Sequence, residues 1–337
     1  MTSPFISVIM PVYNGVKHLN EALESILNQT FTDFEFIILN DGSSDASEEV
    51  ILSYDDKRIR YVNNKENLKI VKTLNKGIKL AKGQYIARMD ADDVALPHRL
   101  ATQLEYMRRH PEVTICGSYL QIYEQPSKIW KVPIIDEAIK VRLLFNSCLY
   151  HPTVFFKKEI FLDYSYESSF LGTEDYDLWQ RLSQNPNIHF ANIPEVLLLY
   201  RVHPNEDKSS YKAKQRMLAN LIRDRQLKNL GFEVTNQTLL LHEAFSSNSV
   251  LSLQWNNLKQ YQQWLVQVEL ANVQAKVYPT AYLKKELEYR WLNLCTRVAP
   301  QHPLVAFKFL FSSFSPNTLD SLYRSMKIFR KSCKRKY

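Results

Sequence analysis

Apolar residues fall in short blocks along the first hundred positions, separated by segments in which they recur with helical spacing. Four blocks rich in Val, Ile and Phe are short enough to be strands, at 6–12, 34–40, 59–64 and 84–90. Between them, apolar residues recur every three or four positions, which predicts amphipathic helices over 18–29 and 68–82. Strands and helices are therefore expected to alternate through this part of the chain.

Two local signals indicate where further helices begin. Asp45, with Glu48 three residues later, resembles a capping box that opens a short helix. Pro97 suits the first turn of another helix. The apolar face of that helix is expected to carry Leu100, Leu104 and Met107.

The alternation predicts an α/β fold with a Rossmann-like, mostly parallel sheet and helices on both faces. In such sheets ligands bind beyond the carboxyl ends of the strands. Asp41 and Asp90 each follow an expected strand at that end. We therefore expect separate acidic side chains along one rim of the sheet.

The pattern changes twice beyond residue 113. Strand-like segments (TVFFKK, EVLLLYRVH) and a helical one (EDYDLWQRL) are mixed up to about residue 202. From about 210 the chain reads as helical and polar, with Trp255, Trp264 and Trp291 on expected helices. This predicts a first domain over 1–210 and a helical C-terminal region over 211–337, which ends in a basic tail.

Composition narrows the class of protein. The chain has 337 residues and a formal charge of +8, which favours polyanionic partners such as nucleic acid, an anionic membrane or a phosphate-bearing substrate. Its 4 cysteines form no CxxC pair, which argues against a disulfide framework and a cysteine-based zinc site. The sequence has no signal-peptide pattern and no apolar stretch of about 18–20 residues. We therefore expect a cytoplasmic protein that contacts membranes only peripherally.

The segment ARMDADD places Asp90, Asp92 and Asp93 directly after an expected strand. One interpretation is structural, since Asp93 could cap the helix near Pro97. A calcium loop of the EF-hand type fails, because the glycine and the glutamate that it requires are absent. The third interpretation is a divalent cation, Mg²⁺ or Mn²⁺, held by carboxylates together with a substrate diphosphate.

Four motifs occur in order, each at the end of its expected element: PVYNG, LNDGSSD, ARMDADD and GTEDYDLW. Over roughly residues 4 to 210 this set resembles the family 2 inverting glycosyltransferases of the GT-A fold. The ordered set carries the resemblance, because a DxD motif alone occurs by chance in many chains. It implies a nucleotide-diphospho-sugar transferase domain with a C-terminal helical extension.

The resemblance also implies roles for particular residues. The residues that would bind the nucleotide sugar are Pro11, Val12, Tyr13 and Asn14 against the base, Asp41 on a uracil-type ring, Asp90 and Ala91 near the ribose, and Arg201 on the diphosphate. Asp92 would ligate Mn²⁺ or Mg²⁺, with His203 as a further candidate ligand. The general base maps to Asp175, with Glu174 as the other candidate.

The chemistry of sugar transfer requires two carboxylate sites of this kind. The leaving diphosphate gains charge, which a metal ion stabilises, and the incoming hydroxyl loses its proton to a base. That base must lie on the opposite face of the sugar, and direct displacement inverts the anomeric centre. Asp92 and Asp175 would supply the two sites.

Several of these residues also have a structural interpretation. Asp41 could make a turn with the glycine that follows it, and His203 stands before a proline. His151 has a weak claim to a site role, while Arg88 and Arg99 could merely balance the charge of the acidic cluster. Both interpretations stay open at this stage.

One departure from the family pattern concerns the segment before the DxD motif. Lys69 stands where glycine is common, so we expect the loop there to be shaped differently. The chain also lacks the membrane helices of processive synthases, and its LEYRW segment has Leu287 where their motif has glutamine. Transfer of one sugar is therefore favoured over processive synthesis.

The sequence thus predicts transfer of a single sugar from a nucleotide sugar, UDP-linked by the resemblance, to a glycan or lipid-linked glycan acceptor. The product would serve cell-surface polysaccharide or lipopolysaccharide synthesis. Alternatives are an inactive relative that binds nucleotide sugars, or a sugar nucleotidyltransferase, for which the glycine-rich phosphate loop is missing. No nucleic-acid-binding motif occurs, so we expect no nucleic-acid partner. The aromatic and basic C-terminal tail could contact an anionic membrane.

Overall fold

The computed structural model describes residues 3–202, 209–246 and 255–299, and beyond these only 302, 304–310, 312, 314, 325, 326 and 328. The described residues form two compact units. The first contains those up to Ile139 together with Ser147–Leu218, and the second contains Lys140–Asn146 and those from Ala219 onward. Nothing in the sequence indicates that the short segment Lys140–Asn146 belongs with the C-terminal helices.

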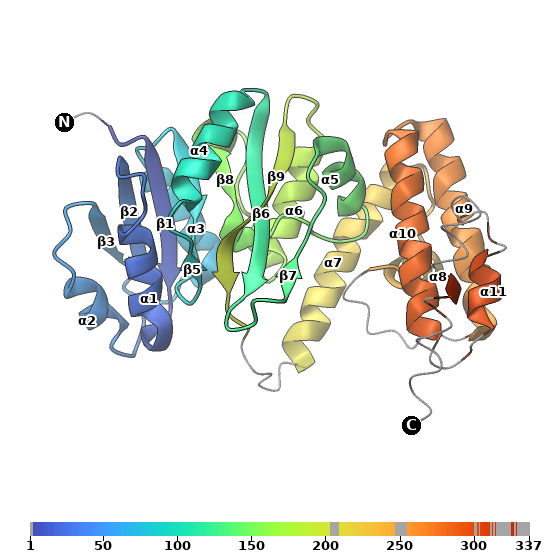
Figure 1. Ribbon diagram of the computed structural model, residues 1–337, viewed down its shortest axis with the longest axis horizontal. Helices are drawn as coiled ribbons and strands as arrows, with labels where there is room; N and C mark the ends of the chain where they lie inside the picture. The colour runs from blue at the N-terminus through green and yellow to red at the C-terminus, as the bar shows by residue number, and fades with distance from the viewer. Residues whose placement is uncertain are drawn as a thin grey trace. The chain divides into compact units, whose positions relative to one another are not determined.

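The first unit is built on one sheet, which has nine strands in the described residues (Figure 1). The strands are β1 (Ile6–Val12), β2 (Phe34–Asn40), β3 (Ile59–Asn63), β4 (Tyr85–Arg88), β5 (Val94–Ala95), β6 (Val113–Ile122), β7 (Ile129–Trp130), β8 (Phe155–Lys157) and β9 (His189–Tyr200). Their order is β3-β2-β1-β4-β8-β6-β9-β5, with β7 paired to β6.

The long ladders of this sheet are parallel. They join β3, β2, β1 and β4 in one half and β6 with β9 in the other. The antiparallel pairings are short, with two or three residue pairs each. The predicted mostly parallel α/β fold is therefore confirmed.

Helices follow most of the strands. Those of the first unit are α1 (Val16–Leu27), α2 (Ser47–Leu52), α3 (Lys69–Leu80), α4 (Arg99–Arg109) and α6 (Glu174–Ser183), with 3₁₀ turns at His151–Thr153, Lys158–Leu162 and Ser168–Phe170. α5 (Asp136–Leu143) and α7 (Ser209–Asn229) contribute residues to both units. The second unit adds α8 (Asn236–Glu243), α9 (Leu258–Ala275), α10 (Thr280–Val298), α11 (Val305–Leu310) and a 3₁₀ turn at Trp255–Asn257.

The strand β1 is buried on both faces, as a central parallel strand should be. On one face, α1 and α4 pack into a common core through residues such as Leu23 and Leu104. On the other face, α3 approaches so closely that a methyl group on Gly77 would lie 2.7 Å from Cγ2 of Ile9. Helices therefore cover both faces, as the alternation predicts (Figure 1).

The predicted capping box at the start of α2 is wrong. Asp45 accepts a hydrogen bond of 3.1 Å from the backbone nitrogen of Val16, and Glu48 accepts one of 2.7 Å from the Tyr61 hydroxyl. Both acids are thus used in tertiary contacts that join neighbouring loops and strands. The periodicity of a single segment does not reveal such partners.

The second unit is helical in its described residues, as the sequence predicts. Trp264 and Trp291 lie buried on α9 and α10, whereas Trp255 belongs to the 3₁₀ turn before α9. Among the described helices, none combines the length and the apolar character that a membrane span requires. The cationic residues of the basic tail lie outside the described residues.

Candidate active site

The predicted base-binding segment 11–14 ends β1 and is hydrogen-bonded to the loop after β2. The backbone nitrogen of Asn14 donates to Oγ of Ser43 at 3.0 Å, and its side-chain oxygen accepts from the Ser44 nitrogen at 2.8 Å. Asn14 has a φ of +50°, which asparagine tolerates better than most residues. The contacts fix the two loops side by side and leave Tyr13 exposed.

Asp41 is buried at the end of β2, where it organises a third loop. Its Oδ1 accepts hydrogen bonds from the Asn64 amide at 2.8 Å, the Leu68 backbone nitrogen at 2.9 Å and the Thr73 hydroxyl at 2.7 Å. Its own backbone nitrogen donates to the Val12 carbonyl at 2.7 Å. Through its carboxylate and its backbone nitrogen, this one residue ties together the carboxyl ends of β1, β2 and β3.

Lys69, at the start of α3, has a φ of +69°. This left-handed conformation favours glycine, because a Cβ crowds the neighbouring carbonyl. The Lys69 nitrogen donates to Oδ1 of Asn67 at 2.9 Å, which supports the turn. The backbone thus keeps a conformation suited to glycine although lysine occupies the position.

The acidic cluster of Asp90, Asp92 and Asp93 lies beyond the end of β4. One oxygen from each carboxylate lies within 4.8 Å of the others. Asp93 is buried, and its Oδ2 has no hydrogen-bond partner among the described residues. Burial and the charge of Asp90 raise the pKa of Asp93 to about 8. Clustered carboxylate oxygens with one buried oxygen unsatisfied fit a hard divalent cation such as Mg²⁺ or Mn²⁺.

Asp93 does not cap the following helix, which begins at Arg99 with His98 as its N-cap and no side-chain cap. Pro97 accordingly precedes this helix instead of standing in its first turn. Oδ1 of Asp93 accepts a hydrogen bond of 2.9 Å from the backbone nitrogen of Arg201. A long-range backbone partner therefore replaces the local one that the sequence suggests.

The side chain of Arg201 holds the cluster to other elements of the first unit. Its Nε donates to the carbonyl oxygen of Asp92 at 2.8 Å. Its guanidinium pairs with Glu21 and lies over the ring of Tyr123, 3.7 Å from the centroid. Arg201 therefore fixes the backbone of the acidic loop.

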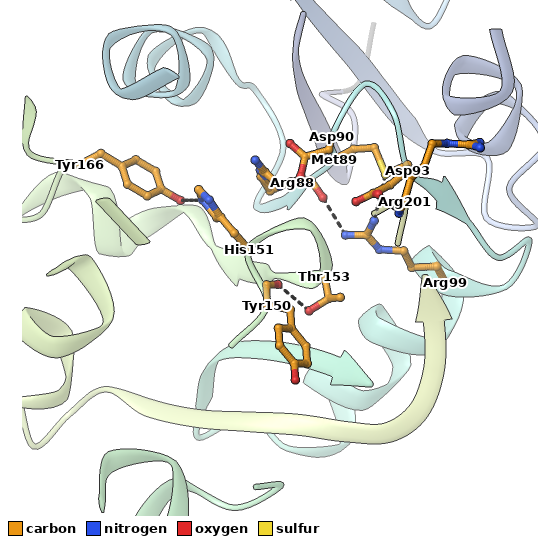
Figure 2. A network of polar contacts seen from close by, with 10 residues as sticks. All are labelled: Arg88, Met89, Asp90, Asp93, Arg99, Tyr150, His151, Thr153, Tyr166 and Arg201. Carbon is orange, nitrogen blue, oxygen red and sulfur yellow. Dashed lines mark hydrogen bonds and ion pairs between the residues drawn. The ribbon is translucent and has the colours of Figure 1, made fainter. Parts of the chain in front are cut away.

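A polar pair lies beside the cluster, formed by the partly buried His151 and the buried Tyr166 (Figure 2). Nε2 of His151 is 2.8 Å from the Tyr166 hydroxyl. Asn75 fixes Tyr166 by accepting from its backbone nitrogen at 3.1 Å and donating to its carbonyl at 2.9 Å. Burial and the nearby Arg88 lower the pKa of His151 well below its usual value, so the ring is neutral. His151 therefore has a defined place in the site.

The two candidate bases, Glu174 and Asp175, begin α6 and have different surroundings. Oε2 of Glu174 accepts a hydrogen bond of 2.6 Å from the backbone nitrogen of Gly172. Oδ2 of Asp175 lies 3.5 Å from the Ser147 hydroxyl. Burial and the charge of Glu174 raise the pKa of Asp175 to about 7. A carboxylate that titrates near neutral pH suits general-base chemistry.

Arg88 connects the two carboxylate sites. It is buried and forms an ion pair with Asp90, and its charge offsets part of the rise in the pKa of Asp175 that burial and Glu174 cause. Its Nε has no hydrogen-bond partner among the described residues. Arg99 donates to the Arg88 carbonyl at 2.7 Å, so the two arginines have different roles: Arg99 supports the strand end, and Arg88 faces the site (Figure 2).

Comparison with known proteins gives the family. The profile of Glycosyl transferase family 2 matches residues 7–165. An uncharacterised glycosyltransferase of Haemophilus influenzae is 32% identical over 273 residues, which are 74% of this chain and 83% of the relative. The chain belongs to glycosyltransferase family 2. The O-antigen biosynthesis glycosyltransferase WbnJ of Escherichia coli is 34% identical over 235 residues, 66% of this chain and 91% of WbnJ.

Solved structures share the GT-A fold of this glycosyltransferase. Residues 1–349 of S. aureus TarS, solved with UDP-GlcNAc, align with a TM-score of 0.55 and 16% identity over 98% of this chain and 91% of that one. The mannosyltransferase PcManGT of Pyrobaculum calidifontis, solved with GDP-Man and Mn²⁺, aligns with a TM-score of 0.53 and 15% identity over 100% and 89%.

In this family 2 glycosyltransferase, the predicted site residues that are described gather at one rim of the sheet and at the start of α6. The rim holds Pro11, Val12, Tyr13, Asn14, Asp41, Asp90, Ala91 and Asp92. His203, the further candidate ligand, lies outside the described residues. The sequence gives no signal for Tyr166 or Ser147, which reach the site only through the fold.

Proposed function

We propose that this glycosyltransferase transfers one sugar, with inversion, from a nucleotide sugar to an acceptor hydroxyl, with Mn²⁺ or Mg²⁺ at the acidic cluster. One observation carries the proposal. Arg88 pairs with Asp90 of the cluster and also acts on Asp175, whose pKa is about 7. The charge of Arg88 thus acts on both the candidate cation site and the candidate base, and the reaction requires one site of each kind.

The residues that would hold the cation are Asp92, with Asp90 and Asp93 beside it. The unsatisfied buried oxygen of Asp93 supports this assignment. When bound, the cation would neutralise the charge that develops on the leaving diphosphate. His203 as a further ligand and the guanidinium of Arg201 as a diphosphate contact belong to the same proposal.

Asp175 would remove the proton from the acceptor hydroxyl. Its anionic form accepts a hydrogen bond from that hydroxyl and then takes the proton as the new glycosidic bond forms. A single displacement of this kind inverts the anomeric centre. Glu174 is less suited, because its carboxylate is held by the Gly172 nitrogen and shapes the start of α6.

The nucleotide would lie against the segment 11–14, with its base near Asp41 and its ribose near Asp90 and Ala91. TarS was solved with UDP-GlcNAc and PcManGT with GDP-Man, which supports a nucleotide sugar as the donor, and the resemblance favours UDP. The relation to WbnJ supports a glycan or lipid-linked glycan acceptor in cell-surface polysaccharide or lipopolysaccharide synthesis. The catalytic domain would span 1–210, and the basic tail would supply any contact with an anionic membrane.

The test is calorimetric titration of UDP and of GDP, each with and without Mn²⁺. The proteins are the wild type, Asp92→Ala and, as a matched control, Asp33→Ala, which alters an exposed acid away from the cluster. Mn²⁺-dependent binding that is lost only in Asp92→Ala supports the proposal. Preference for GDP changes the donor class, and absence of binding to either nucleotide refutes it.

A further inference from the structure

Trp130 is an exposed aromatic side chain that rests on two tyrosines. It lies on β7 with 42% of its surface exposed, whereas Trp179, Trp264 and Trp291 are buried. Its ring centroid lies 5.8 Å from that of Tyr150 and 5.8 Å from that of Tyr200. A tryptophan held in this way presents a fixed apolar surface to solvent.

One of the two tyrosines, Tyr200, stands next to a residue that binds the acidic cluster. Tyr200 is the last residue of β9 and precedes Arg201, whose backbone nitrogen binds Asp93 at 2.9 Å. The pairing of Val94 with Leu199 fixes the register of these two segments. Burial and the charges of the cluster raise the pKa of the Tyr200 hydroxyl to about 12, which agrees with this position.

The other tyrosine, Tyr150, belongs to the segment that contacts the candidate base. Tyr150 lies three residues after Ser147, whose hydroxyl is 3.5 Å from Oδ2 of Asp175. It directly precedes His151, which binds Tyr166. Trp130 therefore contacts Tyr200, which is adjacent in sequence to the Arg201 that binds the acidic cluster, and Tyr150, which is in the same segment as Ser147.

We propose that Trp130, supported by Tyr150 and Tyr200, is the platform on which a sugar ring of the acceptor stacks beside Asp175. This inference rests on the proposed function and deepens it, since it assigns the acceptor side of the same site. A pyranose ring has one face of C–H groups, which packs on an aromatic ring while its hydroxyl groups at the edge remain polar. Ligand sites combine aromatic surface with a few polar groups in this way.

The position of Trp130 favours the acceptor over the donor. The residues assigned to the base and the ribose lie at the end of β1 and after β2 and β4, while Arg201, assigned to the diphosphate, follows β9. Trp130 lies on the strand paired to β6, in the other half of the sheet and next to the segment that carries Ser147. The acceptor hydroxyl must reach the base, and under this proposal it does so from the half of the sheet that carries Trp130.

Kinetics of two reactions test the platform: transfer to an acceptor and hydrolysis of the donor by water when no acceptor is present. The variants are Trp130→Ala, Trp130→Phe and, as a control, Ile129→Ala, which alters an equally exposed residue of the same strand. We expect Trp130→Ala to raise the acceptor KM about tenfold, with donor hydrolysis and nucleotide affinity unchanged. Trp130→Phe should fall between it and the wild type, and Ile129→Ala should match the wild type.

A parallel loss of hydrolysis and transfer in Trp130→Ala would overturn the proposal, and so would unchanged kinetics. If the wild type turns over no donor, the proposed function is refuted and these kinetics do not test the platform. A second measurement therefore tests the platform without a donor. Saturation-transfer NMR with methyl glycosides of glucose, galactose, mannose and N-acetylglucosamine should give signals for the wild type and Ile129→Ala that vanish in Trp130→Ala. If none of these glycosides gives a signal with the wild type, or if the signals persist in Trp130→Ala, Trp130 is not a sugar platform.

Discussion

Oε2 of Glu174 accepts a hydrogen bond of 2.6 Å from the backbone nitrogen of Gly172, two residues earlier in the chain. The carboxylate of Glu174, the first acid of the ED pair, is therefore used to hold the turn before α6. The second acid, Asp175, instead contacts the Ser147 hydroxyl and has a pKa near neutrality. Adjacent carboxylates in one motif thus have separate tasks.

Asp175→Asn should lower the rate of sugar transfer by about 10²–10⁴-fold, because asparagine cannot take a proton from the acceptor. Nucleotide affinity, measured by calorimetry, should stay at the wild-type value. Glu174→Gln keeps an oxygen for the Gly172 nitrogen, so its rate should change far less. If the two variants lose the same activity while both stay folded, the assignment of the base is wrong.

The rate of transfer should depend on pH through the Asp175 carboxyl. The group acts only when it has lost its proton, so the rate should fall as pH drops below about 7 and level off above it. The neighbouring charge of Glu174 contributes to the raised pKa, so Glu174→Gln should move the midpoint to lower pH. Initial rates at saturating donor between pH 5 and 9 would show both effects, and a flat profile would contradict them.

Asp93→Asn should weaken Mn²⁺ binding in the presence of nucleotide by about 10–100-fold. The variant retains an oxygen for the Arg201 backbone and removes the carboxylate charge from the cluster. Because burial raises the pKa of this carboxyl, its loss should raise the temperature of thermal unfolding without metal at neutral pH, or at least not lower it. Calorimetric titration with Mn²⁺ checks the affinity, and wild-type affinity would exclude Asp93 from the cation site.

Gly42→Ala should destabilise the first unit by about 1–3 kcal/mol. Gly42 has a φ of +70°, and an added Cβ would lie 2.8 Å from the carbonyl carbon of Glu66. The substitution would push apart two loops that Asp41 holds together. Urea denaturation gives the free energy of unfolding, and a loss below about 0.5 kcal/mol would show that the loops adapt without strain.

Lys69→Gly should have the opposite effect and raise the free energy of unfolding by up to about 1 kcal/mol. Lysine at a φ of +69° carries strain that glycine lacks, although glycine also gains entropy in the unfolded chain. The same denaturation experiment, with Lys72→Gly inside α3 as a control that should destabilise, separates relief of strain from loss of helix propensity. A destabilised Lys69→Gly would contradict the argument.

The parallel half of the fold could be predicted because its central strands β1 and β2 are buried on both faces. The observed β1 (Ile6–Val12) and β2 (Phe34–Asn40) begin and end where the apolar runs do. The two-residue strands β5 and β7 could not be predicted, because so short a segment has no periodicity. Their pairing depends on long-range partners that only the fold supplies.

The candidate site likewise contains some residues that the sequence predicts and others that only the fold brings together. The acidic cluster stands out in the sequence, since three carboxylates in four positions repel one another unless something neutralises them. Tyr166 and Asn75 are 91 positions apart and meet only in the folded chain. Asp93 was open to a local interpretation as a helix cap, and the backbone of Arg201, 108 positions away, takes that bond instead.

The hydrogen bonds between Asn14 and Ser44 have a consequence for exchanging segments between related enzymes. Because the loops after β1 and β2 are already joined, the nucleotide binding that we propose would not need to order either of them, and little of its free energy would be lost to restricting their motion. A chimaera that receives only one of these loops from a relative would lose the partner atoms of the other. Both loops must therefore be exchanged together if a chimaera is to acquire a new nucleotide preference and keep the hydrogen bonds between the loops.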